Sequence, residues 1–244
     1  MFDLSIDGGI ARLRLRRPEA RNAIPLDGWA ELAACVKQAG QTARLLLLSG
    51  EPGGAFCAGA DIAGFDGFQH DAAARTAFRT AIRTALDGLR DSPIPTIALV
   101  EGACYGAGVA LAIACDVRIA GPAAHFATTP ARLGISYPQE DVHRLVALVG
   151  PGQAARLLLG AQSIDGGEAA RIGLVEIQGS ADAAEALAAA VVANDPASLL
   201  TLKRGIALAA AGVREDERQD REFDELLGSD SAESRIAAYR ARPR

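Results

Sequence analysis

The apolar residues of this chain are spaced in two ways, and each spacing predicts a different element. Near the N-terminus they fall on alternate positions on both sides of a Gly-Gly pair, which predicts a β-hairpin over residues 4–15. Continuous apolar runs at residues 45–48 and 96–100 predict buried strands. Helical spacing predicts helices over residues 26–40 and 72–91. Strands that alternate with helices in this way are typical of an α/β fold.

The same alternation continues past the middle of the chain. A helix is predicted over residues 106–115, a strand over 116–120 and a further helix over 139–149. Gly-Pro-Gly at residues 150–152 ends that helix, and another helix is predicted after it. Asp165 stands three residues before a glutamate and can cap a short helix, which Gly173 can end.

The last part of the chain is predicted to be helical throughout. Asp195 and Pro196 place an N-cap residue before a proline at the first helical position. Residues 215–239 are strongly charged with a helical pattern, and such a tail often packs on a neighbouring subunit. We therefore predict a core over residues 1–190 and a helical oligomerisation region over 191–244.

Composition narrows the classes of partner and location. Half of the 244 residues are hydrophobic, which favours a globular chain, and the net charge of −5 gives no general reason to bind nucleic acid. The four cysteines form no CxxC pair, so a reducing compartment is expected. We find no signal-peptide pattern and no 18-residue apolar run, so we expect a cytoplasmic protein with no membrane contact.

Two turns rich in glycine and alanine, at residues 57–61 and 105–109, carry the candidate chemistry. Each follows a buried strand, and small side chains there leave backbone N–H groups open to a ligand. The second turn begins a helix, whose first N–H groups have no internal partner. Two converging N–H donors would stabilise the oxyanion of a thioester enolate, so we predict that the turns hold an acyl-CoA carbonyl. The alternative is that the turns serve only tight packing.

Several motifs in order carry a family resemblance. The chain reads RPEARNA at residues 17–23, FCAGAD at 56–61 and EAARIGLV at 168–175. Residues 102–116 are similar to a GxxxGGGxxLAxxCD pattern, with Ala107 in place of its middle glycine. These segments resemble the crotonase superfamily, that is, the enoyl-CoA hydratases and isomerases.

The resemblance implies an α/β fold, a crotonase-like spiral of ββα units with a helical C-terminal trimerisation region. It implies a homotrimer or homohexamer that acts on acyl-CoA, with no cofactor beyond the CoA moiety of the substrate and no metal. It places the oxyanion-hole donors on the backbone N–H groups of Ala60 and Ala107. The CoA contacts that it implies are Ala20, Arg21, Ala58, Asp61, Ile62 and Arg242. Alternatives are a helix-cap role for Asp61 and a plain surface role for Arg242.

The chain departs from the hydratases at two positions. Hydratases use two glutamates to position water and move protons. By register, the first position is occupied by Ala110 and the second by Pro130, and neither side chain can carry a proton. Ordinary hydration is therefore not expected.

Replacements for these acids lie a few residues further on. Glu140 is the first candidate for a proton shuttle and Asp141 the second, although acids are also common in the first turn of a helix for electrostatic reasons. Tyr137 lies where a decarboxylase branch has a similar loop with a tyrosine. The leading hypothesis is enoyl-CoA isomerisation. The alternatives are another enolate reaction such as decarboxylation, a divergent hydratase, or a non-catalytic CoA-binding scaffold.

Overall fold

The computed structural model describes residues 1–241, and Arg242 lies outside them. At the N-terminus, β1 (Phe2–Asp7) and β2 (Ile10–Leu15) form the predicted antiparallel hairpin. Gly8 and Gly9 make its turn with φ of 57° and 80°, a backbone conformation that glycine adopts without steric cost.

The strands form two sheets within the described residues. The large sheet has the order β1-β2-β3-β4-β6-β9, and it is parallel from β2 onward. The small sheet has the order β5-β7-β8. The further strands are β3 (Leu45–Ser49), β4 (Thr96–Val100), β5 (Ala103–Tyr105), β6 (Val117–Ala120), β7 (His125–Ala127), β8 (Ile164–Asp165) and β9 (Ile177–Gln178).

Consecutive strands alternate between the two sheets. β4 belongs to the large sheet and β5 to the small one, and α3 (Ala107–Ile113) follows them. β6 and β7 repeat this step before α4 (Gln139–Gly160). This is the ββα unit that the resemblance implies. The predictions of β4 and α3 are confirmed within a residue or two, but β5 was expected to be loop, because three residues are too few to show a period.

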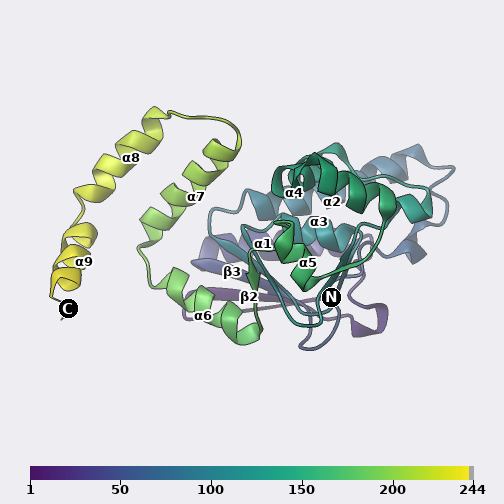
Figure 1. Ribbon diagram of the computed structural model, residues 1–244, viewed down its shortest axis with the longest axis horizontal. Helices are drawn as coiled ribbons and strands as arrows, with labels where there is room; N and C mark the ends of the chain where they lie inside the picture. The colour runs from purple at the N-terminus through teal and green to yellow at the C-terminus, as the bar shows by residue number, and fades with distance from the viewer. Residues whose placement is uncertain (242–244) are drawn as a thin grey trace.

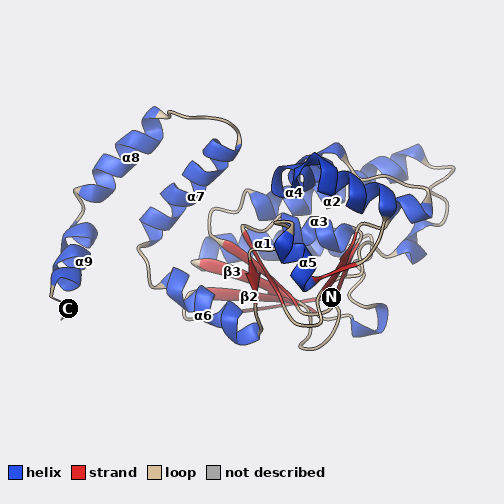
Figure 2. Ribbon diagram, viewed as in Figure 1, coloured by secondary structure: helices blue, strands red, loops and turns tan. Residues whose placement is uncertain are grey.

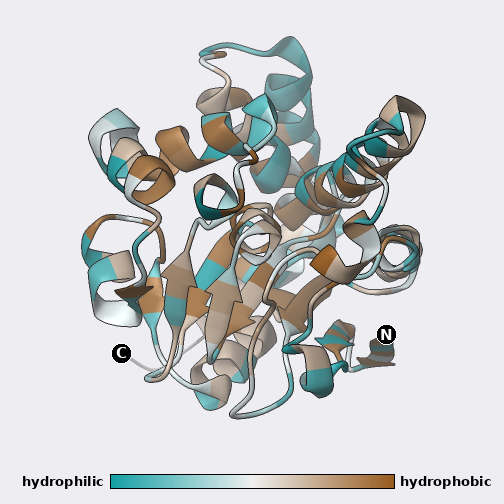
Figure 3. Ribbon diagram, turned by 90° about the vertical axis from the view of Figure 1, so that its right-hand side faces the viewer, coloured by the Kyte–Doolittle hydropathy of each residue, from teal (hydrophilic) through white to brown (hydrophobic). Residues whose placement is uncertain are grey.

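The large sheet is buried on both faces. Along β3, Leu46 and Leu48 belong to the main core cluster, whereas Leu45 and Leu47 belong to a second cluster with Ala184 of α6. Successive side chains of a strand point to opposite faces, which explains the continuous apolar run. Figure 2 shows helices on both sides of the strands, and in Figure 3 hydrophobic segments run through the strands in the middle of the molecule.

The helices of the core lie close to their predicted positions. α1 (Gly28–Thr42) and α2 (Ala72–Arg90) pack against each other over the main cluster. α4 bends at Gly150, whose φ is 75°, so it consists of two helices, as the Gly-Pro-Gly sequence predicted. The remaining core helices are α5 (Gly166–Arg171) and α6 (Ala181–Val192), with short 3₁₀ turns at Pro18–Ala20, Ile62–Phe65 and Pro130–Leu133.

Three helices extend from the core at the C-terminal end: α7 (Pro196–Ala210), α8 (Glu217–Leu227) and α9 (Asp230–Arg240) (Figure 1). None of their residues is buried. Lys203 ties α7 to the core, because its Nζ donates to Asp116 Oδ2 at 2.7 Å. No helix within residues 1–241 is both long and apolar enough to cross a membrane. The boundary at residue 190 stays a prediction.

Candidate active site

A buried asparagine fixes the start of the first turn. The Asn22 side chain donates from Nδ2 to the carbonyl oxygens of Ala55 at 2.7 Å and Phe56 at 3.2 Å. Its Oδ1 accepts from Arg17 N at 2.8 Å, and the residue is 1% exposed. Arg21 and Asn22 both have positive φ, 50° and 58°, which asparagine tolerates better than most residues. The RPEARNA segment therefore acts here as a brace for the first turn.

The two small-residue turns touch each other through their backbones. Cys57 N donates to Ala103 O at 3.1 Å, and Tyr105 N donates to Cys57 O at 2.9 Å. Between these bonds Cys57 and Cys104 form a parallel β-bridge. A Cβ atom at Gly108 would lie 2.2 Å from Cys57 O, so no larger residue fits there. The small residues thus let the two turns approach directly.

This approach brings two backbone donors to one place. A Cβ atom on Gly59 would lie 3.1 Å from Ala107 N, so the residue before Ala60 is in contact with the second turn. Ala107 is the first residue of α3 and has no helical partner for its N–H group. Within residues 1–241, neither the Ala60 nor the Ala107 N–H donates to a protein acceptor. Both residues line the same cavity.

The cavity has a volume of about 600 Å³ and walls that are mainly apolar. Phe65, Phe68 and Phe78 pack in a cluster with ring centroids 5.1 to 5.4 Å apart. Ala110 and Pro130 also line the cavity, so neither position brings an acid into it. The other apolar residues of the wall are Ile62, Ile82, Leu133, Ile135 and Pro138.

The two acids at the start of α4 lie differently. The Asp141 side chain is 2% exposed and the residue lines the cavity. The Glu140 side chain is 54% exposed, and the residue is not part of the cavity wall. Of the cavity-lining residues within 1–241, Asp141 is the only one with a carboxylate. The geometry therefore favours Asp141 as the candidate proton shuttle, whereas the sequence analysis ranked Glu140 first.

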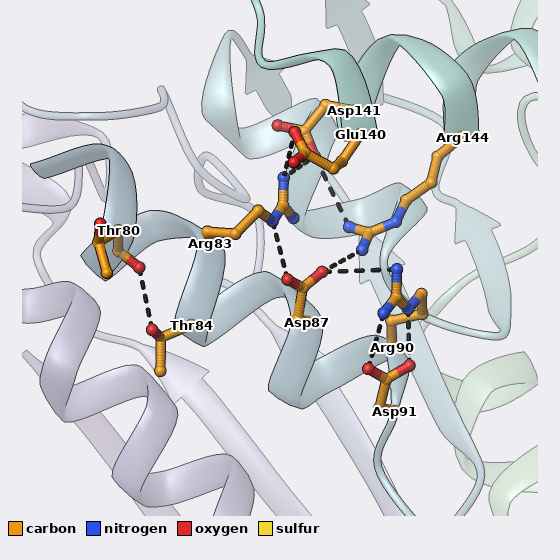
Figure 4. Close-up of polar contacts among 9 residues, drawn as sticks. All are labelled: Thr80, Arg83, Thr84, Asp87, Arg90, Asp91, Glu140, Asp141 and Arg144. Atoms are coloured by element: carbon orange, nitrogen blue, oxygen red, sulfur yellow. Dashed lines mark hydrogen bonds and ion pairs between the residues drawn. The ribbon is translucent and has the colours of Figure 1, made fainter. Parts of the chain in front are cut away.

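Asp141 belongs to a network of two arginines and two aspartates between α2 and α4, the Arg83 network, made up of Arg83, Asp87, Asp141 and Arg144 (Figure 4). Arg83 Nη1 donates to Asp141 Oδ1 at 3.1 Å, and Arg83 Nε donates to Asp87 Oδ2 at 3.1 Å. Arg144 Nη2 donates to Asp87 Oδ1 at 2.6 Å. These four residues were not predicted as a unit, although the arginines at helical spacing on α2 were a usable signal.

The network has two consequences for the Asp141 carboxylate. Burial raises its pKa, and the neighbouring Arg83 and Arg144 oppose that shift only in part. Oδ1 is occupied by Arg83, whereas no described residue donates a hydrogen bond to Oδ2. Asp141 therefore lines the cavity with one carboxylate oxygen that has no hydrogen-bond donor among the described residues, and its pKa lies above that of an ordinary aspartate.

Tyr137 lines the cavity beside the second turn. Its hydroxyl donates to Gly106 O at 2.5 Å, next to the Ala107 N–H, and burial raises its pKa well above the usual range. Tyr137 thus holds the second turn as a neutral phenol. The sequence identified the residue but not this contact, which joins segments 31 positions apart.

The residues implied as CoA contacts divide into two groups. Ala58 and Ile62 line the cavity, next to Ala60. Arg21 is exposed, and its carbonyl accepts from Ala58 N at 2.9 Å. Ala20 is part of the same 3₁₀ turn and does not line the cavity.

Asp61 has its own partners within the protein. Its carboxylate accepts from Arg17 Nη1 at 2.6 Å and from Ala63 N at 3.1 Å, which makes it the N-cap of the following 3₁₀ turn. The hydrogen bond from Arg17 lowers its pKa. The cap role expected as an alternative is therefore present, and a CoA contact by Asp61 stays a prediction.

Known proteins are similar to this chain over nearly its whole length. Residues 5–231 match the protein family described as Enoyl-CoA hydratase/isomerase. The protein named "Probable enoyl-CoA hydratase echA6" from Mycobacterium tuberculosis is 32% identical over 100% of this chain and 98% of its own. A solved enoyl-CoA hydratase/isomerase family structure from Hyphomonas neptunium superposes with a TM-score of 0.92 at 35% identity, covering 99% of this chain and 95% of that one.

A second solved structure agrees. The enoyl-CoA hydratase/carnithine racemase from Magnetospirillum magneticum gives a TM-score of 0.90 at 29% identity, covering 98% of this chain and 92% of that one. The ββα fold and these matches define the class, the crotonase superfamily. This chain belongs to its enoyl-CoA hydratase/isomerase family. The reaction that it catalyses is a separate question, because the family name covers more than one.

Proposed function

We propose that this protein isomerises the double bond of a 3-enoyl-CoA to the 2-enoyl-CoA. The observation that carries the proposal is the buried carboxylate of Asp141 in the cavity that also contains the Ala60 and Ala107 N–H groups. Isomerisation needs a single group that takes a proton and returns it, whereas the usual hydration needs two acids. Ala110 and Pro130 in the cavity wall argue against hydration for the same reason.

The Ala60 and Ala107 N–H groups bind the thioester oxygen. Asp141 Oδ2 accepts a proton from the α carbon, and the electron pair of that C–H bond moves toward the carbonyl, so negative charge collects on the thioester oxygen. The two N–H donors stabilise this dienolate, and one such donor is typically worth about 100- to 1000-fold in rate. Asp141 then returns the proton to the γ carbon, which leaves the double bond between the α and β carbons.

Two substitutions in adjacent residues test this mechanism. Asp141→Asn is expected to reduce isomerisation of a 3-enoyl-CoA by about 100-fold or more, because amides do not accept the proton. Glu140→Gln is the matched control and is expected to keep most of the activity, since Glu140 is exposed. Undiminished activity in Asp141→Asn would refute the proposed mechanism. Loss in Glu140→Gln alone would restore the ranking suggested by the sequence.

The same assay separates the other reactions. Rapid hydration of a 2-enoyl-CoA by the wild-type protein would favour a divergent hydratase. Retained binding of acyl-CoA without turnover of any enoyl-CoA would favour the non-catalytic scaffold. Binding itself is followed by calorimetry, so it does not depend on the reaction.

We also infer that the protein assembles through its C-terminal helices, as a homotrimer or homohexamer. α7 and α8 expose large apolar side chains that no described residue covers, including Ile206 at 71% and Phe223 at 62% exposure. Exposed apolar surface of this kind commonly marks a protein interface. Sedimentation velocity of the purified protein tests the number of subunits.

A further inference from the structure

α2 carries a row of three arginines, Arg75, Arg79 and Arg83, each one helical turn from the next. Like charges at this spacing repel, so each arginine needs a partner or water. Arg83 has the carboxylates of its network, and Arg75 donates from Nη1 to the carbonyl of Phe68. Arg79 forms no hydrogen bond or ion pair with any residue between 1 and 241.

Arg79 is also part of the cavity wall. It follows Phe78 of the aromatic cluster, and the wall near it is mainly apolar. The only carboxylate of the wall within the described residues, Asp141, is already engaged by Arg83. The cavity wall thus carries two arginines, Arg75 and Arg79, that form no ion pair with a described carboxylate. Arg79, which is solvent-exposed, is the one of the two that also forms no hydrogen bond with a described residue.

The chemical nature of the bound acyl group determines whether the Arg79 guanidinium gains a hydrogen-bond acceptor. A neutral acyl chain would offer the Arg79 guanidinium no hydrogen-bond acceptor. A carboxylate would offer two acceptor oxygens that match the planar fork of a guanidinium. The charge of the cavity thus favours an acyl group that ends in an anion.

The spacing of residues along α2 also indicates the length of that acyl group. Arg79 lies one turn before Arg83, about 6 Å along the axis of α2, and Arg83 binds Asp141 directly. An acyl group whose α carbon faces Asp141 therefore needs only a short chain to bring its far end to Arg79. Six carbons are a suitable length for a probe.

We propose that Arg79 determines specificity by binding a second carboxylate at the far end of the acyl group, so that the substrates are CoA monothioesters of short dicarboxylic acids. The proposal rests on the proposed function for the position of the reacting carbon beside Asp141. It concerns ligand binding, which is measured without turnover.

The test compares adipoyl-CoA with hexanoyl-CoA, two saturated six-carbon thioesters that differ in a terminal carboxylate or methyl group. By isothermal titration calorimetry, the wild-type protein is expected to bind adipoyl-CoA about tenfold or more tightly than hexanoyl-CoA. Arg79→Gln is expected to remove this preference and to leave hexanoyl-CoA binding nearly unchanged. Arg214→Gln, the same change at an exposed arginine between α7 and α8, is the control and should keep the preference.

Two results would overturn the proposal. One is a wild-type protein without preference for adipoyl-CoA, a comparison that needs no variant. The other is an equal loss of both ligands in Arg79→Gln, which would assign Arg79 to the shared CoA phosphates. Failure of the proposed reaction gives a different result. A protein that prefers adipoyl-CoA but does not isomerise any 3-enoyl-CoA would support the Arg79 subsite and refute the proposed isomerisation.

Discussion

Arg83 Nη1 lies 3.1 Å from Asp141 Oδ1, and this ion pair joins α2 to the first turn of α4 at the cavity wall (Figure 4). Burial raises the pKa of Asp141 and Arg83 lowers it, and the effect of burial is the larger of the two. In the proposed mechanism Asp141 must be ionised to accept the α proton. Arg83 is therefore a positioning residue that also sets the pH at which the base is available.

Replacing Arg83 should move the pH dependence of the reaction. In Arg83→Gln the pKa of Asp141 is expected to rise further, because the largest opposing charge is lost. Activity that requires the carboxylate falls as pH decreases through this pKa, so the acidic limb of kcat/KM should shift to higher pH. Arg171→Gln, at an exposed arginine of α5 that pairs with Glu168 outside the network, is the control. A fall in kcat/KM at all pH values with no shift of the limb would assign Arg83 a purely structural role.

The contact between the two turns should not tolerate a methyl group. In Gly108→Ala the new Cβ atom would lie 2.2 Å from Cys57 O, so one of the turns must move. We expect the free energy of unfolding to fall by about 1–3 kcal/mol and the catalytic activity to fall more steeply, because the Ala60 and Ala107 donors separate. Urea denaturation and initial rates measure the two effects.

Gly88→Ala is the matched control for that substitution. Gly88 lies inside α2, and a Cβ atom added there would meet no neighbouring atom within 4 Å, so alanine should stabilise the helix by about 0.5–1 kcal/mol. Equal stability of Gly108→Ala and the wild-type protein would contradict the direct contact of the turns.

The amide of Asn22 should be needed for stability. Asn22→Asp keeps the size, the tolerance of positive φ and the acceptor for Arg17 N, but it removes both Nδ2 hydrogen bonds to Ala55 and Phe56. A loss of about 1–3 kcal/mol in the free energy of unfolding is expected, since a buried carboxylate would then face two carbonyl oxygens. Asn194→Asp, at an exposed helix end, should change the stability little. Similar values for the two variants would refute the brace assigned to Asn22.

The Arg17–Asp61 pair should make stability depend on pH in acid. The pKa of Asp61 is lowered in the folded protein, so its contribution is present above the ordinary aspartate pKa of about 4 and is lost as pH falls through the lower, folded value. Asp61→Asn is expected to be less stable than the wild-type protein at pH 7, with the difference shrinking below about pH 4. Denaturation curves at several pH values measure this, and a constant difference would exclude the linkage.

The exposed apolar side chains of α8 should matter for assembly. Phe223 is 62% exposed in the single chain, and Phe223→Glu places a charge at this position. The substitution is expected to reduce the oligomer to smaller species in sedimentation velocity. Glu217→Gln on the same helix, where the side chain is 98% exposed, is the control. A wild-type protein that sediments as a monomer would contradict assembly through these helices.

Much of the fold could be predicted from local pattern. The hairpin, α1 and α2 follow from periodicity, because each is long enough to show its period. β3 and β4 follow from continuous apolar runs, which are typical of strands buried on both faces. The cap at Asp195 was predicted from one dipeptide, and its side chain accepts from Ser198 N at 2.9 Å. β5 was less accessible, because a strand of three residues is too short to show a period.

The sequence by itself determined the family and the two turns, because these depend on short motifs whose residues are neighbours in the chain. The tertiary structure decided which acid reaches the cavity. Glu140 and Asp141 are adjacent, and a helix turns by about 100° per residue, so one points outward and the other inward once α4 is packed on α2. The tertiary structure also decided that Arg83 is paired and Arg79 is not. The Arg83 partner, Asp141, lies 58 positions further along the chain, on α4.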